Sequence, residues 1–470
     1  MSESTHTSPN AEVGSIKPED PTTAVLEHRG IEPVPEADRT GSPWSLFTVW
    51  MGANSQFATL TTGVLATAVF GLSFWQALAA ITLGTTLGAA TLAAFSLGGP
   101  RLGVPQMVQS RRAFGYVGNF APATLNAFSA LSYFAVNTIL GVFALQVLLG
   151  ISFGLGLVGL VIVQTLIAVV GHHLIHTVER WLSLLLIALF IALSIYGFGH
   201  GHTATGSNAR AIHAVGGFSG AFILMTSISF SYAIGWVAYA SDYSRYLPRT
   251  IKAWRVWVPA GMAMLLAGVW IESLGAAFGT AEAIDQPAQL VHGLVPHSLG
   301  QITMVGIVLG AITANVITIY SGTLSALVLN LRLERWIVAV ILSATGTVIA
   351  WFAGQGGFYR NYENFVFLVG YWLTPWIAIA GIDLLNDWRA RTAAPSMDAF
   401  FDRRCRLRRG FVIWLISIAV SVPFWNQSLY RGPIATRIPA LGDITYFVGL
   451  LVAAALYTLA RTPIRPVSKR

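Results

Sequence analysis

The sequence predicts an all-α polytopic membrane protein with twelve transmembrane helices. Apolar residues make up 54% of the 470 residues and charged residues only 10%, against roughly 25% charged in soluble domains. The chain divides into apolar stretches of roughly 20 residues, which is the length of helix that crosses a bilayer. With twelve spans, 24 of the 28 Lys and Arg fall on one side. Because cationic loops stay in the cytoplasm, we expect both termini there, in a plasma-membrane protein.

The twelve expected spans alternate in direction, so that basic loops gather at one end of the molecule. Only Arg210, Arg360, Arg431 and Arg437 fall on the opposite side. The expected spans are 44–70, 74–97, 119–149, 152–171, 182–199, 217–240, 256–279, 298–330, 337–354, 363–384, 410–427 and 440–460. Glycine pairs such as Gly84/Gly88, Gly275/Gly279 and Gly306/Gly310 are expected to let helix backbones pack closely.

The composition divides the chain into a transport core and flanking segments. Residues 1–42 are polar and rich in Pro, Glu, Ser and Thr, which predicts a disordered cytoplasmic tail. Residues 43–384 would form a ten-helix core, and the basic loop 385–409, with seven Arg, separates it from two additional helices in 410–460. Residues 461–470 would form a cytoplasmic tail. Cys405 is the only cysteine, which excludes an internal disulfide.

The net charge of +8 does not indicate a nucleic-acid partner, because the basic residues lie in short loops beside the membrane. In such loops they orient the chain and contact anionic lipid. The bilayer is therefore the expected partner, and no feature indicates an obligatory protein partner. Phosphate-binding glycine loops and assembled catalytic groups are not recognisable, which argues against ATP-driven transport and against an enzyme.

Two spans carry polar and small residues in the middle. The first contains Gly52, Asn54, Ser55 and Gln56, and the sixth contains a serine-rich run that ends at Gly235-Trp236. The two spans are five apart, and an odd offset reverses the direction in the membrane. Interrupted helices in two inverted halves indicate a transporter's midplane binding site. The alternative is that these are interior faces with small residues for packing.

The loop after the second span carries the most specific motif. Residues 105–115 run Pro-Gln-Met-Val-x-Ser-Arg-x-x-Phe-Gly, and this run resembles the signature loop of the nucleobase–cation symporter-1 family, in particular its purine–cytosine permease branch. Segments 133–141, 235–248 and 370–375 agree with the same family in order and spacing. The similarity extends from about residue 44 to residue 385.

The resemblance implies a fold and an activity. The fold is the LeuT-like five-plus-five inverted repeat shared with sodium–amino-acid symporters, here with two extra helices. The activity is import of a nucleobase, cytosine or a purine, by symport with H+ or Na+ and without another cofactor. Within the family, the rival substrates are uracil, allantoin, hydantoins and thiamine. A channel or a membrane receptor with the same fold is the alternative from a different class.

A flat, uncharged base needs aromatic faces to stack on and polar groups to bond its edge. By resemblance, the aromatic groups are Tyr133 in the third span, where related permeases usually have Trp, and Trp236 beside Gly235 in the sixth. Tyr232 is the alternative for the second ring. Asn137 aligns with a family amide that faces substrate, or else forms an interhelical hydrogen bond.

Further polar candidates lie on the first and eighth spans. Gly52, Asn54, Asn315 and Thr318 complete the expected substrate site, although Asn54 and Gln56 could instead cap the unwound segment. The family's sodium site would use the carbonyls of Ala53 and Gln56 with Asn315 and Thr318. That site is incomplete, because Ile319 occupies its second hydroxyl position.

Three charged residues are candidates for coupling and gating. Glu272 lies within the seventh span, where an acid is costly and commonly functional. It would carry the proton in a proton-coupled mechanism, or serve as a neutral, hydrogen-bonded structural group. Asp242 and Arg245 lie three residues apart at the cytoplasmic end of the sixth span. They form either an inner-gate ion pair or an exposed helix pair.

Overall fold

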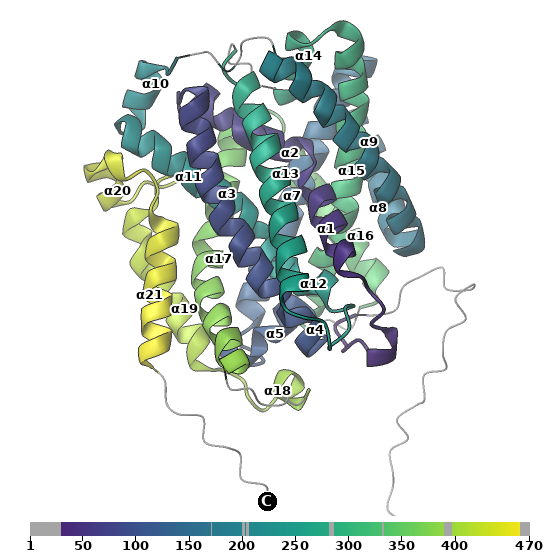
Figure 1. Cartoon of the computed structure of the whole chain (residues 1–470), viewed down its shortest axis with the longest axis vertical. Coiled ribbons are helices and arrows are strands. Elements are labelled where there is room, and N and C mark those ends of the chain that lie inside the picture. The colour runs from purple at the N-terminus through teal and green to yellow at the C-terminus, as the bar shows by residue number, and fades with distance from the viewer. Residues whose placement is uncertain are drawn as a thin grey trace, which may run out of the picture.

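The computed structural model describes residues 30–170, 172–199, 203, 206–281, 286–330, 333–389 and 397–460. Within these ranges nearly all of the regular structure is helical, which confirms the predicted all-α class. The long helices run roughly along one axis (Figure 1). The short helices α10, α14 and α20 lie at one end of that axis, and α4, α5 and α18 lie at the other (Figure 1).

Seven stretches in the described part of the chain are long and apolar enough to cross a membrane. Five shorter apolar helical stretches accompany them, so the exact count of twelve spans stays a prediction. The helices of the long stretches are α3 (Phe74–Ser96), α7 (Phe120–Leu149), α11 (Gly217–Gly235), α13 (Trp254–Phe278), α15 (His297–Leu327), α16 (Arg335–Ala353) and α17 (Phe358–Arg389). Those of the shorter stretches are α2 (Phe57–Val64), α8 (Phe153–Val170), α9 (His172–Gly199), α19 (Arg409–Ser421) and α21 (Thr445–Leu459).

Short helices connect or extend these spans. They are η1 (Glu36–Asp38), α1 (Pro43–Asn54), η2 (Leu65–Val69), α4 (Gly98–Leu102), α5 (Gln106–Gln109), α6 (Arg111–Phe114), α10 (Ala209–Ala214), η3 (Trp236–Tyr239), α12 (Ala240–Ser244), α14 (Pro287–Leu294), α18 (Asp398–Phe401), η4 (Val422–Phe424), α20 (Pro433–Arg437) and η5 (Pro439–Leu441). The segment η2 is a π-helical turn that ends the first span.

Local sequence explains where the first helices begin and end. Ser42 caps α1 with its hydroxyl and Pro43 occupies the first helical position, where its missing N–H costs nothing. Gly71 has a φ of +72°, which makes the tight turn between the first two spans. Ser73 and Gln76 then form a capping box at the start of α3.

The helices form two packed groups that meet around the middle of the molecule. We call α1, α2, α3, α11 and α13 the bundle, because α3 packs along α11 and α13, and α13 packs on α1 and α2. We call α7, α8, α15 and α16 the frame, because α15 packs along α7 and both contact α8 and α16. The additional helices α19 and α21 pack on α17.

The small residues that were expected to permit close packing lie at helix–helix contacts. A Cβ on Gly84 would collide with the Thr226 carbonyl of α11, and a Cβ on Gly275 would collide with the Leu60 carbonyl of α2. Gly306 faces Leu189 of α9 in the same way. These contacts confirm the packing interpretation of the glycine pairs.

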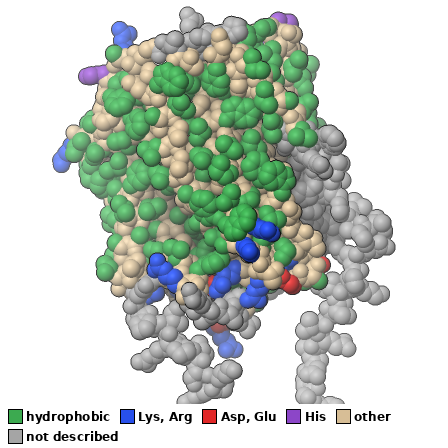
Figure 2. Space-filling view, viewed as in Figure 1, with side chains coloured by type: hydrophobic (Ala, Val, Ile, Leu, Met, Phe, Trp, Pro, Cys, Tyr) green, Lys and Arg blue, Asp and Glu red, His purple; other side chains and the backbone are tan. Residues whose placement is uncertain are grey.

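The surface matches a protein that spans a bilayer. On the face drawn in Figure 2, hydrophobic side chains cover the broad middle of the molecule, and Lys and Arg gather at one end. That end carries α4, α5 and α18 in the same view (Figure 1). It is the end that the loop charges assign to the cytoplasm.

The expected N-terminal tail over residues 1–42 is too long. From Gly30 onward the chain makes specific contacts: the Val34 N–H donates to the Gly103 carbonyl at 2.9 Å, and the Gly41 N–H donates to the Tyr246 carbonyl at 2.9 Å. The polar composition of this segment did not indicate its contacts, because backbone groups form the hydrogen bonds and the segment has no apolar face that a sequence pattern would reveal. Residues 1–29 and 461–470 lie outside the described residues.

Candidate functional site

The first span is interrupted at the predicted place. Helix α1 ends at Asn54 and α2 begins at Phe57. Ser55 (φ −81°, ψ 62°) and Gln56 (φ −138°, ψ 164°) leave the helical conformation between them. Part of the freed backbone is satisfied locally: the Asn54 amide donates to the Trp50 carbonyl at 2.8 Å, and the Ser55 hydroxyl donates to the Met51 carbonyl at 2.8 Å. The capping alternative therefore holds for the Asn54 amide nitrogen.

The sixth span does not unwind, which corrects the expectation of two matching breaks. Helix α11 continues from Gly235 into the 3-10 segment η3 (Trp236–Tyr239) and then into α12. The Trp236 N–H donates to the Ala233 carbonyl, three residues back. A 3-10 segment is a tighter helix that still forms backbone hydrogen bonds. The serine-rich run and Gly235 are therefore followed by a change of helix type, but not by a break in the helix.

Aromatic rings from three spans surround η3. The ring of Tyr133 on α7 lies nearly parallel to Trp236, with centroids 6.2 Å apart and an interplanar angle of 17°. Tyr232 meets Tyr133 edge to face at 6.3 Å, and Phe365 of α17 does so at 4.8 Å. The structure thus brings together all three predicted aromatic residues. Phe365 was missed, because no sequence pattern marks it among 26 Phe.

Gly235 lies directly against this cluster. A Cβ on Gly235 would meet the Tyr133 hydroxyl at 2.6 Å, so only glycine admits the tyrosine at this distance. The Tyr133 hydroxyl is buried and has no hydrogen-bond partner among the described residues. Gly52 lies in the last turn of α1, where its carbonyl accepts the Ser55 N–H at 3.1 Å.

Polar side chains from the interrupted first span border the rings. The Gln56 amide donates to the Tyr232 hydroxyl at 3.2 Å, and the Thr59 hydroxyl lies 2.8 Å from the same oxygen. The Gln56 Oε1 and Asn54 Oδ1 atoms are buried without a partner in the described part of the chain. Buried polar atoms are normally satisfied, so these acceptors are suited to bond a ligand or a water molecule.

Two expected sodium ligands, Asn315 and Thr318, make their described side-chain hydrogen bonds within the frame. The Asn315 side chain is engaged within the frame: its amide donates to Thr138 at 2.8 Å and to Gln164 at 3.1 Å, and its oxygen accepts from the Asn137 amide at 3.1 Å. The Thr318 hydroxyl donates to the Ala314 carbonyl of its own helix at 2.8 Å. Among the hydrogen bonds of the described residues, none joins Ala53 or Gln56 to Asn315 or Thr318. Asn137 therefore makes the interhelical bond that was its alternative role.

Glu272 is fully buried on α13 and faces α11. Its Oε2 atom accepts a hydrogen bond of 2.5 Å from the Ser229 hydroxyl, three residues before Tyr232. Its Oε1 atom is buried and has no partner among the described residues. Gly63 of α2 packs against the Glu272 backbone and leaves no room for a side chain. Ser229 was not predicted, because one serine among several in the sixth span carries no distinguishing signal.

Asp242 and Arg245 have separate hydrogen-bond partners. The Asp242 carboxylate accepts the Gln106 N–H at 2.9 Å, which ties α12 to the loop that carries the 105–115 motif. Arg245 is fully buried and donates to the hydroxyls of Tyr246 at 3.0 Å and Tyr320 at 3.4 Å. Neither expected arrangement, a direct ion pair or an exposed pair, describes these contacts.

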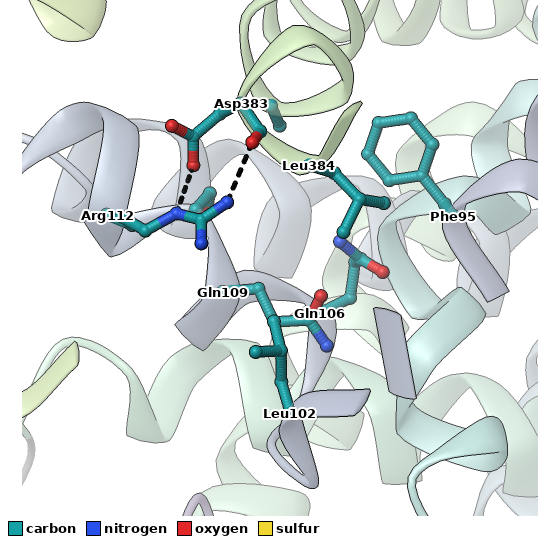
Figure 3. A pocket seen from close by; sticks show the side chains of 9 residues that line it. Phe95, Leu102, Gln106, Gln109, Arg112, Asp383 and Leu384 are labelled. Carbon is teal, nitrogen blue, oxygen red and sulfur yellow. Dashed lines mark hydrogen bonds and ion pairs between the residues drawn. The ribbon is translucent and has the colours of Figure 1, made fainter. Parts of the chain in front are cut away.

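A small pocket lies beside this loop, at the end of the molecule that carries α4 and α5 (Figure 3). Arg112 and Asp383 of α17 both line it and are bonded to each other, with Nε 2.6 Å from Oδ2 (Figure 3). Burial alone would lower the pKa of Arg112, but Asp383 and Asp387 outweigh that effect and raise it. Arg101 also pairs with Asp387. Arg101 and Arg112 thus fasten the loop between α3 and α7 to the end of α17.

Comparison with known proteins matches residues 33–449 to a family described as permeases for cytosine/purines, uracil, thiamine and allantoin. The chain belongs to this family. It is therefore a transport protein rather than an enzyme, as the sequence motif predicted. The family assignment covers the core, α19 and the beginning of α21.

Two curated relatives align with this permease over most of its length. YxlA of Bacillus subtilis, assigned as a purine-cytosine permease, is 32% identical over 93% of this chain and 96% of its own. The purine-cytosine permease fcyB of Emericella nidulans is 28% identical over 93% of this chain and 88% of its own.

Among solved structures, Mhp1, a nucleobase-cation-symport-1 family transporter, superimposes with a TM-score of 0.72 at 19% identity. The match covers 92% of this chain and 94% of Mhp1, whose structure is a closed conformation with bromovinylhydantoin bound. At this identity the likeness establishes the fold, and it confirms the predicted inverted-repeat architecture.

Proposed function

We propose that this permease imports a nucleobase, cytosine or a purine, across the plasma membrane by cation-coupled alternating access. Both termini would lie in the cytoplasm, as the positions of Lys and Arg indicate. The bundle would rock against the frame around a site bounded by the first span, the sixth span and Tyr133 of α7. The observation that carries the proposal is the near-parallel pair Tyr133 and Trp236 beside the unwound residues Ser55 and Gln56.

The ring pair has the geometry of a closed clamp for a flat ligand. Carbon atoms in contact lie about 3.5 Å apart, so a ring held between two others needs them roughly 7 Å apart. The centroids of Tyr133 and Trp236 lie 6.2 Å apart. A base would enter only after the two rings move apart until their planes are roughly 7 Å apart. Phe365, from α17, would form a third wall.

The polar atoms at the first span suit the edge of a base. The unpaired Gln56 Oε1 can accept a ring N–H or an exocyclic amino group, while the Gln56 amide nitrogen is held by Tyr232. Asn54 Oδ1 supplies a second buried acceptor. Two acceptors favour ligands with donor groups at their edge, such as cytosine, adenine and guanine.

We propose a proton as the coupling ion and Glu272 as its carrier. A carboxylate at this depth would hold its charge with a single hydrogen bond, from Ser229, and no cation beside it in the described contacts. That is a costly arrangement, which favours the protonated acid in at least one state of the cycle. The sodium alternative lacks one hydroxyl ligand, because Ile319 occupies that position.

The test is uptake into proteoliposomes of purified protein, with sodium and proton gradients imposed separately. A panel of radiolabelled cytosine, adenine, guanine, uracil, allantoin and thiamine would be compared in competition. The proposal predicts saturable accumulation of an amino-bearing base, driven by an inward proton gradient and abolished by a protonophore. Accumulation that follows only sodium would refute the coupling assignment. Uptake that equilibrates without concentrating solute would indicate a channel.

A further inference from the structure

The segment Gly30–Gly41, which we call the strap, lies across the cytoplasmic ends of the helices that border the site. Its middle is fixed to the loop after α3: the Val34 N–H donates to the Gly103 carbonyl at 2.9 Å, and Arg39 Nη1 donates to the Pro100 carbonyl at 2.9 Å. Arg39 Nε also donates to the Val34 carbonyl at 2.9 Å, which closes the strap on itself. Val34 is 2% exposed.

The two ends of the strap are fixed to the residues that follow α12. The Gly41 N–H donates to the Tyr246 carbonyl at 2.9 Å, and Arg245 Nη1 donates to the Gly30 carbonyl at 3.2 Å. Glu36 accepts the Arg249 N–H at 3.0 Å. Gly30 also lies beside Leu327, near the end of α15 in the frame. The strap therefore touches both of the helix groups that must separate at this end.

Beneath the strap, a chain of aromatic rings leads from the site toward the cytoplasmic end. Trp236 meets Trp50 at 6.0 Å, and Trp50 meets Tyr243 at 5.4 Å. Tyr243 meets Tyr320 of α15 at 6.2 Å, and the Tyr320 hydroxyl lies 3.4 Å from that of Tyr246. These rings join the bundle to the frame and fill the route between the site and the strap. Arg245, bonded to Tyr320 and to Gly30, links the last ring to the strap.

We propose that the strap is a latch on this inner gate. While Arg245 is shared between Tyr320 and the Gly30 carbonyl, the cytoplasmic ends of α12 and α15 are held together. Movement of the bundle away from the frame would break the contact between Arg245 and Tyr320, and release of the strap would remove the second support of the Arg245 side chain. Loss of the strap therefore shifts the population toward the state that is open to the cytoplasm. This inference rests on the alternating access of the proposed function, but not on the identity of the base or the ion.

The single native cysteine makes the inference testable by accessibility. Cys405 is replaced by Ser, and Ser321→Cys then places a thiol on α15, where Ser321 is fully buried 3.3 Å from the Tyr243 hydroxyl. In inside-out vesicles, a membrane-impermeant maleimide reaches this thiol only when the gate opens. We expect Arg39→Ala, which removes two hydrogen bonds from a charged group, to raise the labelling rate roughly tenfold.

Arg249→Ala is the matched control, because the exposed Arg249 contributes a backbone N–H to the strap and its side chain can be removed without losing that bond. Its labelling rate should equal that of the parent. A second pair keeps the test decisive if Arg39→Ala does not fold: deletion of residues 2–41 should raise labelling, and deletion of residues 2–29 should not. Equal labelling in all variants would overturn the latch. Because labelling needs no substrate, that outcome is separate from any failure of nucleobase uptake.

Discussion

The first and sixth spans hold corresponding places in the two halves of the core, yet they are interrupted differently. The first loses helical structure at Ser55 and Gln56 and offers polar side-chain atoms there. The sixth keeps its backbone hydrogen bonds by turning into the 3-10 segment Trp236–Tyr239. A backbone that satisfies itself leaves only side chains for a ligand. The comparison supports the proposal that one span would bond the edge of the substrate and the other would stack on its face.

The largest effect should come from the acid that lies against the sixth span. Glu272→Gln keeps the shape and the bond to Ser229 but cannot release a proton. We expect proton-driven accumulation to disappear, with the internal-to-external ratio falling to about one, while exchange of labelled for unlabelled base continues. Glu334→Gln, at an exposed acid just before α16, is the control and should still accumulate substrate. Full accumulation by Glu272→Gln would remove this residue from the coupling mechanism.

Removal of the aromatic ring that the sixth span would stack on the substrate should have the next largest effect on transport. Trp236→Ala deletes one of the two parallel rings, and stacking of a base on an aromatic ring is worth roughly 1–3 kcal/mol. The apparent affinity should therefore fall roughly ten- to hundredfold. Trp75→Ala, on a ring that is 67% exposed on α3, is the matched control and should leave KM unchanged. An unaltered KM in Trp236→Ala would refute the stacking role.

Removing the edge contact of the first span should cost less. Gln56→Ala deletes one hydrogen-bond acceptor for the ligand, and a net hydrogen bond is worth about 0.5–1.5 kcal/mol. We expect KM to rise roughly two- to tenfold, and more for bases with an amino group than for uracil. Thr59→Val is the control, because it removes the other contact to Tyr232 and keeps Gln56. Equal losses for amino and carbonyl bases would contradict edge recognition by Gln56.

The smallest effect on transport is expected in the frame. Asn315→Ala leaves the Asn137 amide without its described partner and removes the bonds from Asn315 to Thr138 and Gln164, which still bond each other. A buried polar group left unsatisfied costs about 1–3 kcal/mol. The melting temperature should fall, whereas KM should stay within about twofold of the parent. A large rise in KM, or loss of a sodium dependence, would show that Asn315 lies in the binding site after all. Uptake of radiolabelled base gives KM, and a thermal unfolding curve gives the melting temperature, so the two measurements separate the two outcomes.

The fold and the aromatic half of the site were accessible from the sequence because each depends on a strong local signal. Hydrophobic length and loop charge predicted the spans, and the family motif placed Tyr133 and Trp236. Side-chain direction was not accessible: Asn315 and Thr318 lie on a predicted span, but helix rotation turns their polar groups into the frame. The backbone hydrogen bonds of the strap could not be predicted either, since nothing in the composition of residues 30–42 distinguishes a packed segment from a disordered tail.

The most direct measurement is a cryo-EM structure of the protein with bound cytosine or adenine. The account predicts the base between Tyr133 and Trp236, with the two rings moved apart from their present contact until their planes are roughly 7 Å apart, and its amino-bearing edge toward Gln56. A base bound elsewhere, with the two rings still at their present separation, would contradict it.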